Sequence, residues 1–450
     1  MQDFSFSSST RRQFFGSIAL PALSLPIWGS LTAHTASAAP PDPAQLASLF
    51  AALALDGRSP EDAARDEDLW REVQQAFTVD RSIVNLNNGG VSPSPRIVQE
   101  SMKRHLDYSN TATAYTMWRI QEPQRETVRQ RLAKEWNVDS EELAVTRNSS
   151  ESLETCQYGL DLRAGDEVLT TTHDYPRMIT TFKQRARREG IVLRQFKIPV
   201  PCEDNGEIVR LFEENITERT RLILMCHIVN ITGQILPVRD VVAMARRRNI
   251  PVIVDGAHAL AHFDFKLSDL NCDYYGVSLH KWLFAPHGTG LLYVRKDKIQ
   301  PLWPIMAAGP ELNANIRKFE EIGTHPAANF LAIAEALTFH QGIGGARKEA
   351  RLRYLRNRWA KRLLAFSDRV RLHTSLKDRF SCAIATVQVE GLDTAKLADW
   401  LFNQHKIFTV AIIHDEFNGL RITPSVYTTL EEVDRFGDAM EHAITKGLPA

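Results

Sequence analysis

Short, mainly apolar runs that end in polar residues recur along the middle of the chain. They cover residues 143–146, 221–226, 250–254 and 274–277, and polar or small residues follow each of them. Residues 167–172, which are richer in threonine, read as another strand and are followed by a histidine. Such runs are typical of parallel strands that are buried on both faces. Because ligands in open α/β sheets lie beyond the carboxyl ends of the strands, the residues after these runs are the first candidates for a site.

Two of these runs lead to an acid and a lysine. The run at 250–254 ends on Asp255, and the run at 274–277 is followed by Ser-Leu-His-Lys281. A lysine in a partly desolvated site has a lowered pKa and can form a Schiff base. Pyridoxal phosphate (PLP) uses such a lysine, with an acid that keeps its pyridine nitrogen protonated. Buried strands also end in aspartate without a site, and most lysines are solvated, so this pair alone does not decide the function.

The lysine segment resembles a motif of a known family. Residues 278–295 read Ser-Leu-His-Lys-Trp-Leu-Phe-Ala-Pro-His-Gly-Thr-Gly-Leu-Leu-Tyr-Val-Arg, which is similar to the lysine motif of class V aminotransferases. That family includes cysteine desulfurases and isopenicillin N epimerase, and with the motifs below the resemblance extends from about Val84 to Pro424. It implies an α/β, fold-type I PLP-dependent transferase. A large domain with a mostly parallel seven-stranded sheet would carry Lys281 and Asp255 as catalytic residues, and a small C-terminal α+β domain would follow.

A serine-rich turn is the candidate phosphate site. Residues 143–154 read as strand, tight loop and helix, and the free N–H groups of a helix N-terminus with serine hydroxyls bind anions. An ordinary serine helix cap is the alternative. The family's phosphate loop has this form, usually with glycine where Asn148 stands, and asparagine tolerates a left-handed conformation. The resemblance implies that phosphate is held by four residues of one chain: Ser149, Ser150, Ser278 and His280.

A fifth phosphate contact is implied from a second subunit. Residues 320–326 read Glu-Glu-Ile-Gly-Thr-His-Pro and resemble the family's Gly-Thr segment. In that family the threonine reaches the partner's phosphate, so Thr324 implies an obligate homodimer with shared sites. The alternative is a turn before a helix that begins near Ala327.

Three residues match positions that surround the PLP ring in the family. His173 follows the strand at 167–172, and the family's histidine there stacks on the pyridine ring. Asn230 follows the strand at 221–226 and matches an asparagine that hydrogen-bonds the phenolic oxygen. His258 stands where cysteine desulfurases have glutamine, and a histidine there can also move protons. A lone loop histidine with satisfied hydrogen bonds remains the alternative for His173.

Two further residues are candidates for substrate binding. Arg421 lies in a Leu-Arg-Ile segment, where the family has an arginine for the substrate carboxylate, and a planar guanidinium suits a bidentate pair. Asn88 lies in the turn-rich loop at 85–93, which resembles a family loop near the substrate. A turn followed by a helix cap near Pro95 explains this loop equally well.

A zinc site is the competing interpretation of one segment. His258 and His262 are four residues apart, as in a helical metal pair, and Asp255 and Asp264 flank them. This interpretation leaves Lys281 and the serine loop unexplained, so we expect no metal.

The N-terminus predicts export. Arg11-Arg12 lies in a Ser-Thr-Arg-Arg-Gln-Phe-Phe motif, an apolar stretch covers 18–31, and Ala-Ser-Ala38 is a small-residue cleavage site. The order of these features favours a twin-arginine signal, with the twin-arginine translocase as a partner and the periplasm as the destination. This route carries folded proteins and therefore suits an enzyme that loads PLP in the cytosol.

Length and composition bound the remaining possibilities. The chain has 450 residues, which suffices for two domains, and its formal net charge is zero, so nothing indicates nucleic acid or an acidic membrane surface. The predicted division is a signal peptide at 1–38, an N-terminal helical segment at 39–95, a large domain at 96–325 and connecting helices with the small domain at 326–450. Helices are expected at 43–55, 60–77, 348–365, 394–405 and 429–446. The five cysteines have no metal-ligand spacing, and their odd number argues against a full disulfide framework.

The reaction type is less constrained than the cofactor. A desulfurase needs a reactive cysteine on a mobile loop of the small domain, and Cys382, the one cysteine there, lies in an apolar strand pattern. Export and the whole-chain resemblance to isopenicillin N epimerase-like proteins favour a periplasmic enzyme for an amino acid or a peptide-linked glutamate. It resembles the periplasmic PLP enzymes of pseudomonads that modify the siderophore pyoverdine. A generic aminotransferase, an epimerase or racemase, a C–S lyase and a PLP-fold binding protein without turnover remain as alternatives.

Overall fold

The computed structural model describes Phe50 and residues 57–449. The predicted signal peptide and nearly all of the predicted helix at 43–55 lie outside the described residues. Among the described residues, no helix combines the length and the apolar character that a bilayer span requires.

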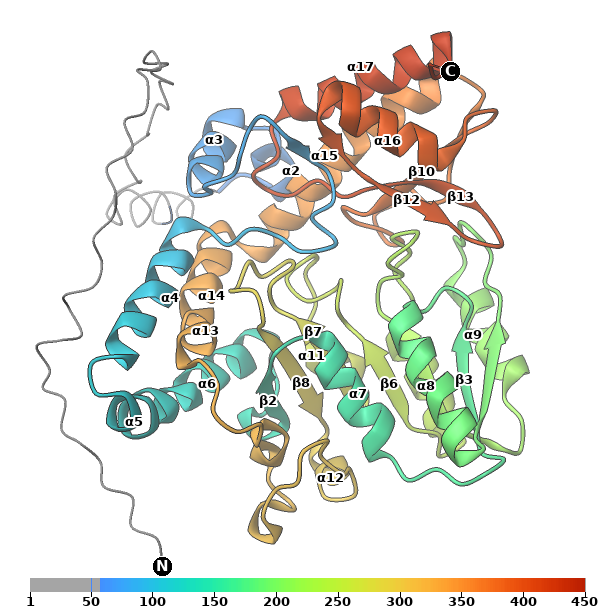
Figure 1. Cartoon of the computed structure of the whole chain (residues 1–450). Helices are drawn as coiled ribbons and strands as arrows, with labels where there is room; N and C mark the ends of the chain where they lie inside the picture. Colours follow the sequence, from blue (N-terminus) through green and yellow to red (C-terminus); the bar gives the residue numbers. More distant parts are fainter. Residues whose placement is uncertain (1–49, 51–56, 450) are drawn as a thin grey trace, which may run out of the picture. The chain divides into compact units, whose positions relative to one another are not determined.

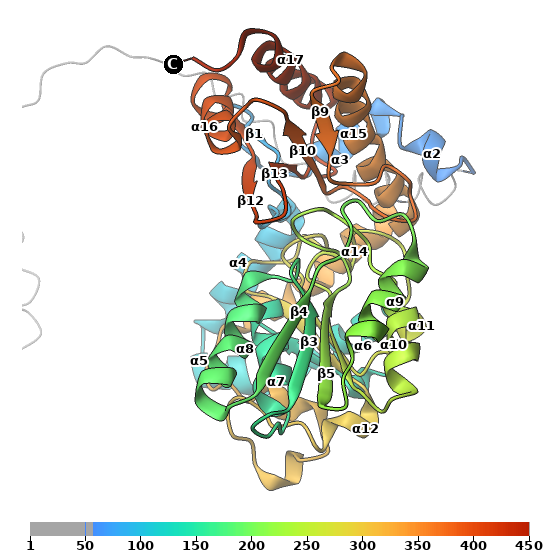
Figure 2. The ribbon, with the colours of Figure 1, turned by 90° about the vertical axis from the view of Figure 1, so that its right-hand side faces the viewer.

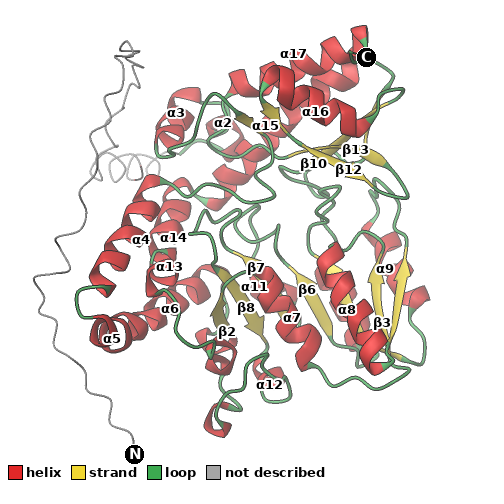
Figure 3. Cartoon of the chain, viewed as in Figure 1, coloured by secondary structure: helices red, strands yellow, loops and turns green. Residues whose placement is uncertain are grey.

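A seven-stranded sheet forms the centre of the large domain (Figure 3). Its strand order is β2-β8-β7-β6-β5-β3-β4, and every neighbouring pair is parallel except the two pairs that involve β8. The prediction of a mostly parallel sheet is therefore confirmed. The strands are β2 (Leu143–Thr146), β3 (Glu167–Thr171), β4 (Val192–Phe196), β5 (Thr220–Cys226), β6 (Val252–Asp255), β7 (Tyr274–Ser278) and β8 (Gly290–Val294).

Helices cover both faces of this sheet, which explains why its strands are apolar throughout. Figure 2 shows α7 and α8 on one side of β3, β4 and β5, and α9 and α10 on the other. Alternate residues of β5 point to opposite faces of the sheet. Leu222 and Leu224 pack with α7 and α8, whereas Ile223 and Met225 belong to the hydrophobic cluster on the face covered by α9 and α10. The helices of the large domain are α4 (Arg96–Ser109), α5 (Thr113–Tyr115), α6 (Arg125–Trp136), α7 (Ser149–Gly159), α8 (Pro176–Glu189), α9 (Asn205–Asn215), α10 (Val238–Arg246), α11 (Leu267–Leu270) and α12 (Lys296–Ile299). Single π and 3-10 turns lie at Thr116–Gln121, Glu122–Gln124, Ser140–Glu142, Pro310–Leu312 and Ile316–Glu320.

The C-terminal part forms the predicted small α+β domain, whose helices α16 (Thr394–His405) and α17 (Leu430–Lys446) lie at the top of Figure 1. Its antiparallel sheet has the order β12-β13-β10-β9. The strands are β9 (Val370–Leu372), β10 (Ala385–Val389), β11 (Ile407–Phe408), β12 (Val410–Ile413) and β13 (Asn418–Ile422). Two connecting helices, α13 (Ala327–Leu331) and α14 (Ile333–Ile343), pack on α4 and α6 of the large domain. They are followed by α15 (Gly345–Phe366), α16 (Thr394–His405) and α17 (Leu430–Lys446). The last three helices agree with the predicted ones within three residues at each end.

The N-terminal segment packs on this small domain. Strand β1 (Val84–Asn85) pairs in parallel with β11, and α2 contacts α15. The expected single helix at 60–77 is wrong, because it is divided into α2 (Pro60–Ala63) and α3 (Glu67–Gln75). The side chain of Asp66 accepts hydrogen bonds from the backbone N–H groups of Asp68 and Leu69. It therefore caps the N-terminus of α3 and separates this helix from α2.

Candidate active site

Four predicted site residues follow four strands that neighbour one another in the sheet. Lys281 follows β7, Asp255 ends β6, Asn230 follows β5, and His173 follows β3. These strands are parallel and consecutive in the order β7-β6-β5-β3, so all four residues lie at the same edge. Since neighbouring strands lie about 4.8 Å apart, the row spans about 14 Å, which accommodates a small aromatic cofactor.

Lys281 is partly buried beside His258. The Nζ atom of Lys281 lies 3.2 Å from Nε2 of His258, and the indole N–H of Trp282 donates to Nδ1 of His258 over 3.4 Å. Burial lowers the pKa of Lys281 to about 8, although the charge of Asp255 opposes this shift. The lysine thus has the properties expected of a cofactor-binding amine.

Asp255 is a buried carboxyl group without an ion pair. One of its oxygens accepts the backbone N–H of Ala257 over 3.0 Å, and no arginine, lysine or histidine of the described residues lies within ion-pair distance. Burial raises the pKa of Asp255 to about 6, although the nearby charge of Lys281 lowers it. Such an acid fits a site that receives a cationic ring nitrogen.

Three buried polar atoms of the predicted site lack a partner. They are Oδ1 of Asn230, Nδ1 of His173 and Nε of Arg421. Buried polar groups in proteins are nearly always hydrogen-bonded, so unpaired ones call for an explanation. A bound PLP ring and its substrate would bring polar groups to this edge of the sheet, and these groups would explain the unpaired atoms. The residues present therefore fit PLP.

The serine loop is joined to the lysine segment. The backbone N–H of Ser149 donates to Oγ of Ser278 over 3.0 Å, and the hydroxyl of Ser278 donates to that of Ser149 over 2.9 Å. His280 donates from Nδ1 to the carbonyl of Thr289 over 3.0 Å. Ser150 lies in the first turn of α7 and is partly exposed. Ser149, Ser150, Ser278 and His280 can therefore hold a phosphate at the N-terminus of α7.

Asn148 differs from the expectation for this loop. Its φ of −174° is extended backbone, so the left-handed tolerance of asparagine is not used. Instead its side chain caps α7 by accepting the backbone N–H of Glu151 over 2.9 Å. The residue that must be glycine for close packing is Gly290 of β8. A Cβ atom at this position would lie 2.6 Å from the backbone nitrogen of Asn148.

Thr324 is exposed on a loop next to the serine loop. It borders a hollow with Arg125 and Glu320, and the adjoining His325 lines a cavity of about 310 Å³ that also contacts Asn148. Its contact with a partner's phosphate stays a prediction.

Arg421 is buried without a carboxylate. Its guanidinium donates to the carbonyl of Asn230 over 3.2 Å and to the side-chain oxygen of Asn87 over 2.8 Å, and no acid of the described chain pairs with it. Burial lowers its pKa to about 10, which leaves it charged at neutral pH. An unpaired buried cation of this kind fits a substrate carboxylate.

The loop at 85–93 contributes a different asparagine from the predicted one. Asn88 is fully buried, and its amide group donates to the carbonyls of Asn85 and Thr423. Its side-chain oxygen accepts the hydroxyl of Tyr427. Asn88 therefore ties the loop to the small domain, while its neighbour Asn87 contacts Arg421.

The zinc interpretation of His258 and His262 fails on geometry. Nδ1 of His262 donates to the carbonyl of His258 over 2.6 Å, and its Nε2 accepts the backbone N–H of Ala383 over 2.9 Å. The ring is also stacked on Trp282 with 3.6 Å between the ring centroids. Both nitrogens of His262 are thus occupied by backbone groups.

Comparison with known proteins identifies the family. The model of the aminotransferase class-V family matches residues 84–436. The chain belongs to this family. It is therefore a PLP-dependent enzyme of fold type I, and the sheet order, Lys281 and Asp255 agree with that membership.

Individual relatives agree with the family. Isopenicillin N epimerase of Streptomyces clavuligerus is 30% identical over 397 residues, which cover 83% of this chain and 98% of the relative. A probable cysteine desulfurase of Pseudomonas aeruginosa is 29% identical over 321 residues, which cover 67% of this chain and 78% of the relative. The solved structure of the cysteine desulfurase CsdA of Escherichia coli has a TM-score of 0.72 at 20% identity and covers 84% of this chain and 98% of its own. That of the cystine C–S lyase C-DES with cysteine persulfide has a TM-score of 0.69 at 23% identity, with coverages of 80% and 97%.

Three residues of this site were not predicted from the sequence. Trp282 contacts His258, Asn87 contacts Arg421, and Glu416 contacts His173. Trp282 directly follows Lys281 in the sequence, and this position could have indicated that it belongs to the site. Glu416 lies 243 residues from His173, and only the fold brings the two together.

Proposed function

We propose that this protein is a periplasmic PLP enzyme that acts at the amino-bearing carbon of an amino acid or a peptide-linked glutamate. The observation that carries the substrate class is Arg421, a buried cation with no acid partner in the described chain. Arg421 also donates to the carbonyl of Asn230, which lies in the same row of strand ends as Lys281.

The bound cofactor would act as an electron sink for a carbanion at the amino-bearing carbon. Lys281, whose pKa burial lowers to about 8, would take and return the proton at that carbon in its neutral form. Asp255 would keep the ring nitrogen protonated, and Asn230 and His258 would hydrogen-bond the ring oxygen. The ring of His173 would pack on the cofactor, and Arg421 would hold the substrate carboxylate.

Export supports a substrate outside the cytoplasm. The Arg11-Arg12 motif, the apolar stretch and the Ala-Ser-Ala site favour the twin-arginine route. A glutamate side chain of the siderophore pyoverdine is the specific substrate that we favour. A generic aminotransferase, an epimerase or racemase like the Streptomyces relative, and a binding protein without turnover are the alternatives. Cys382 argues against a desulfurase, because it is buried in the apolar core.

An absorption spectrum tests the central claim. We expect purified protein to show a band near the visible edge that disappears in Lys281→Ala, and borohydride to attach the cofactor covalently to Lys281. Absence of such a band after PLP is added would refute the proposal. A retained band that no amine of a periplasmic extract changes would support the binding-protein alternative.

Genetic experiments test the substrate and the export. Deletion of the gene should change the mass of the secreted siderophore, and an unchanged mass would exclude pyoverdine as the substrate. Replacement of Arg11-Arg12 by two lysines should retain the protein in the cytoplasm. Undiminished periplasmic activity of that variant would contradict the signal.

A further inference from the structure

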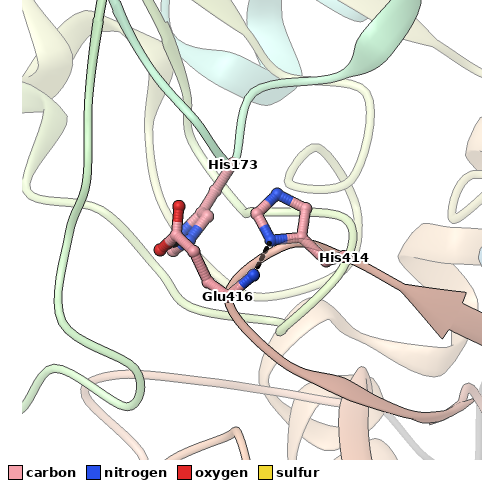
Figure 4. A group of neighbouring side chains, drawn as sticks. All are labelled: His173, His414 and Glu416. Carbon is pink, nitrogen blue, oxygen red and sulfur yellow. Dashed lines mark hydrogen bonds and ion pairs between the residues drawn. The ribbon is translucent and has the colours of Figure 1, made fainter.

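A cluster of three side chains joins the two domains next to the proposed cofactor site (Figure 4). His173 belongs to the loop after β3, whereas His414 and Glu416 belong to the hairpin between β12 and β13. The carboxylate of Glu416 accepts Nε2 of His173 over 3.0 Å and the hydroxyl of Thr172 over 2.6 Å. None of these contacts is used by the function proposed above.

Hydrogen-bond roles define the proton positions in this cluster. The carboxylate of Glu416 is an acceptor, so Nε2 of His173 carries the proton and the neutral ring leaves Nδ1 as its lone-pair acceptor. That Nδ1 is buried and has no partner in the described chain. Nδ1 of His414 accepts the backbone N–H of Glu416 over 3.2 Å, and its Nε2 donates to the carbonyl of Thr172 over 3.2 Å.

The charged groups around His173 support a neutral ring beside a charged acid. Burial lowers the pKa of His173, and the hydrogen bond and charge of Glu416 partly offset this; His414 lowers the pKa and Asp174 raises it. Burial raises the pKa of Glu416, but hydrogen bonds from Thr172 and His173 outweigh it, so the pKa is lowered overall. At neutral pH the carboxylate is therefore the only charged member of the pair.

We propose that Glu416 is a positioning residue that holds His173 in the Nε2–H tautomer and leaves Nδ1 as a proton acceptor for the reaction at this site. Lys281 takes the proton at the amino-bearing carbon, whereas a proton released by the substrate amine would move to Nδ1 of His173. Glu416 would balance the charge of the resulting imidazolium, as the acid does in Ser-His-Asp triads. The electron pair stays with the substrate. The proposal rests on the function proposed above.

The location of Glu416 couples this chemistry to the arrangement of the domains. Thr172 and His173 belong to the large domain, and the hairpin that carries Glu416 belongs to the small one. If the hairpin moves away, His173 loses the carboxylate that selects its tautomer. The acceptor at Nδ1 is thus complete only while the hairpin rests on the loop after β3.

A metal ion is the alternative occupant of this cluster. Two histidines and a carboxylate are a donor set for zinc, and their ligand atoms lie within 4.8 Å of one another. However, both nitrogens of His414 are engaged with backbone groups, and Nε2 of His173 is bound to Glu416. A metal would have to break these hydrogen bonds, so we favour the positioning role.

Nitrogen NMR of histidine-labelled protein tests the proposal without turnover. In the apoenzyme we expect His173 to show the Nε2–H tautomer, with its signal assigned by its loss in His173→Gln. Glu416→Gln should yield mixed or inverted tautomers, because an amide can also donate, and should lower the pKa of His173 by roughly one to two. In the active holoenzyme the same variant should shift the limb of the kcat–pH profile that reports His173.

Glu203→Gln is the matched control. Glu203 also joins the domains, because it accepts the hydroxyl of Ser375 over 2.6 Å and pairs with Lys377, but it contacts no histidine. We expect this variant to leave the tautomer and the pKa of His173 unchanged. Thr172→Val, which removes one donor but keeps the carboxylate, should also preserve the tautomer. If Glu416→Gln does not fold, an Nδ1–H tautomer of His173 in the wild-type apoenzyme would itself overturn the proposal.

Two further results would overturn the proposal. One is an unchanged tautomer and pKa of His173 in folded Glu416→Gln. The other is stoichiometric zinc binding by the apoenzyme that is lost in both His414→Ala and Glu416→Gln. Since these measurements use apoenzyme, they are separate from the cofactor spectrum, and failure to bind PLP would instead refute the function on which the proposal rests.

Discussion

The Nζ atom of Lys281 lies 3.2 Å from Nε2 of His258, and the proton in this contact belongs to the histidine. The indole of Trp282 can only donate, so Nδ1 of His258 must be an acceptor and a neutral imidazole carries its proton on Nε2. That N–H can donate only to an uncharged amine. The contact is therefore favourable when Lys281 is deprotonated, which is the form that reacts with a carbonyl group.

The first prediction is an acidic Lys281. Burial lowers its pKa to about 8, so the neutral amine predominates above that pH. We expect acylation of Lys281 in the apoenzyme, followed by mass spectrometry, to be half-maximal near pH 8. The exposed Lys183 serves as an internal reference for the reagent. A rate at Lys281 that continues to rise beyond pH 10 would contradict the prediction.

The second prediction concerns Trp282. Phenylalanine removes the indole N–H, so His258 can adopt the other tautomer and accept a proton from a charged lysine. Since one neutral hydrogen bond contributes about 1 kcal/mol, Trp282→Phe should raise the pKa of Lys281 by roughly 0.7. Trp359→Phe is the control, because Trp359 is equally buried but packs against Phe436 in the small domain. An equal shift in the pKa of Lys281 in both variants would show that the tautomer of His258 does not control this pKa.

The third prediction is that Asp255→Asn stabilises the apoenzyme above pH 6. Burial raises the pKa of Asp255 from 3.8 to about 6, so the folded state binds this proton more tightly than the unfolded state does. The stabilisation from this proton is complete below pH 3.8 and is lost as the pH rises through 6. The cost at pH 8 is on the order of 3 kcal/mol, which asparagine removes.

Thermal unfolding of the apoenzyme at two pH values provides the test. We expect the Tm of Asp255→Asn to exceed that of the wild type at pH 8, and the difference to shrink at pH 4.5. Asp273→Asn is the contrasting control, because Asp273 is also buried but pairs with Arg295 over 2.9 Å and accepts the N–H of Val252. That variant should be less stable at both pH values. A lower Tm of Asp255→Asn at pH 8 would refute the assignment.

Much of the fold was predictable because local signals and the global arrangement agree. Apolar runs indicated the buried strands, and the helix at Thr394–His405 has the bounds that its pattern predicted. The break at Asp66 was missed, because apolar periodicity continues through it while the cap acts locally. The parallel pairing of Val84–Asn85 with Ile407–Phe408 has no local signal, since its partners are more than 300 residues apart.

The site likewise contains residues that the sequence predicts and residues that only the folded structure shows. Residues at or just beyond strand ends, such as Asp255 and Lys281, could be predicted because the carboxyl ends of neighbouring parallel strands lie at the same edge of a sheet. Asn87 and Asn88 are neighbours with similar chemistry, and only the folded loop shows that Asn87 reaches Arg421. Glu416 could not be found from the sequence, because its role depends on how the small domain rests on the large one.

The fourth prediction concerns Cys382. Burial raises the pKa of its thiol to about 12, so the reactive thiolate is essentially absent at neutral pH. We expect an aromatic disulfide reagent to leave Cys382 unmodified in the native protein and to modify it after denaturation. Cys382→Ala should retain turnover of the amine substrate. Loss of turnover in a folded Cys382→Ala variant would restore the desulfurase-like alternative.

The last prediction concerns Arg421, whose charge is unpaired in the described chain. Lysine keeps a charge but loses the bidentate geometry, so Arg421→Lys should raise KM for a carboxylate substrate roughly tenfold to a hundredfold, with a smaller change in kcat. Because burial lowers the pKa of Arg421 only to about 10, the KM of the wild type should not change through this residue between pH 7 and 8.5. Arg356→Lys is the control, since Arg356 is also fully buried but lies in α15 and contacts Ser381. An unchanged KM in Arg421→Lys would place the substrate carboxylate elsewhere.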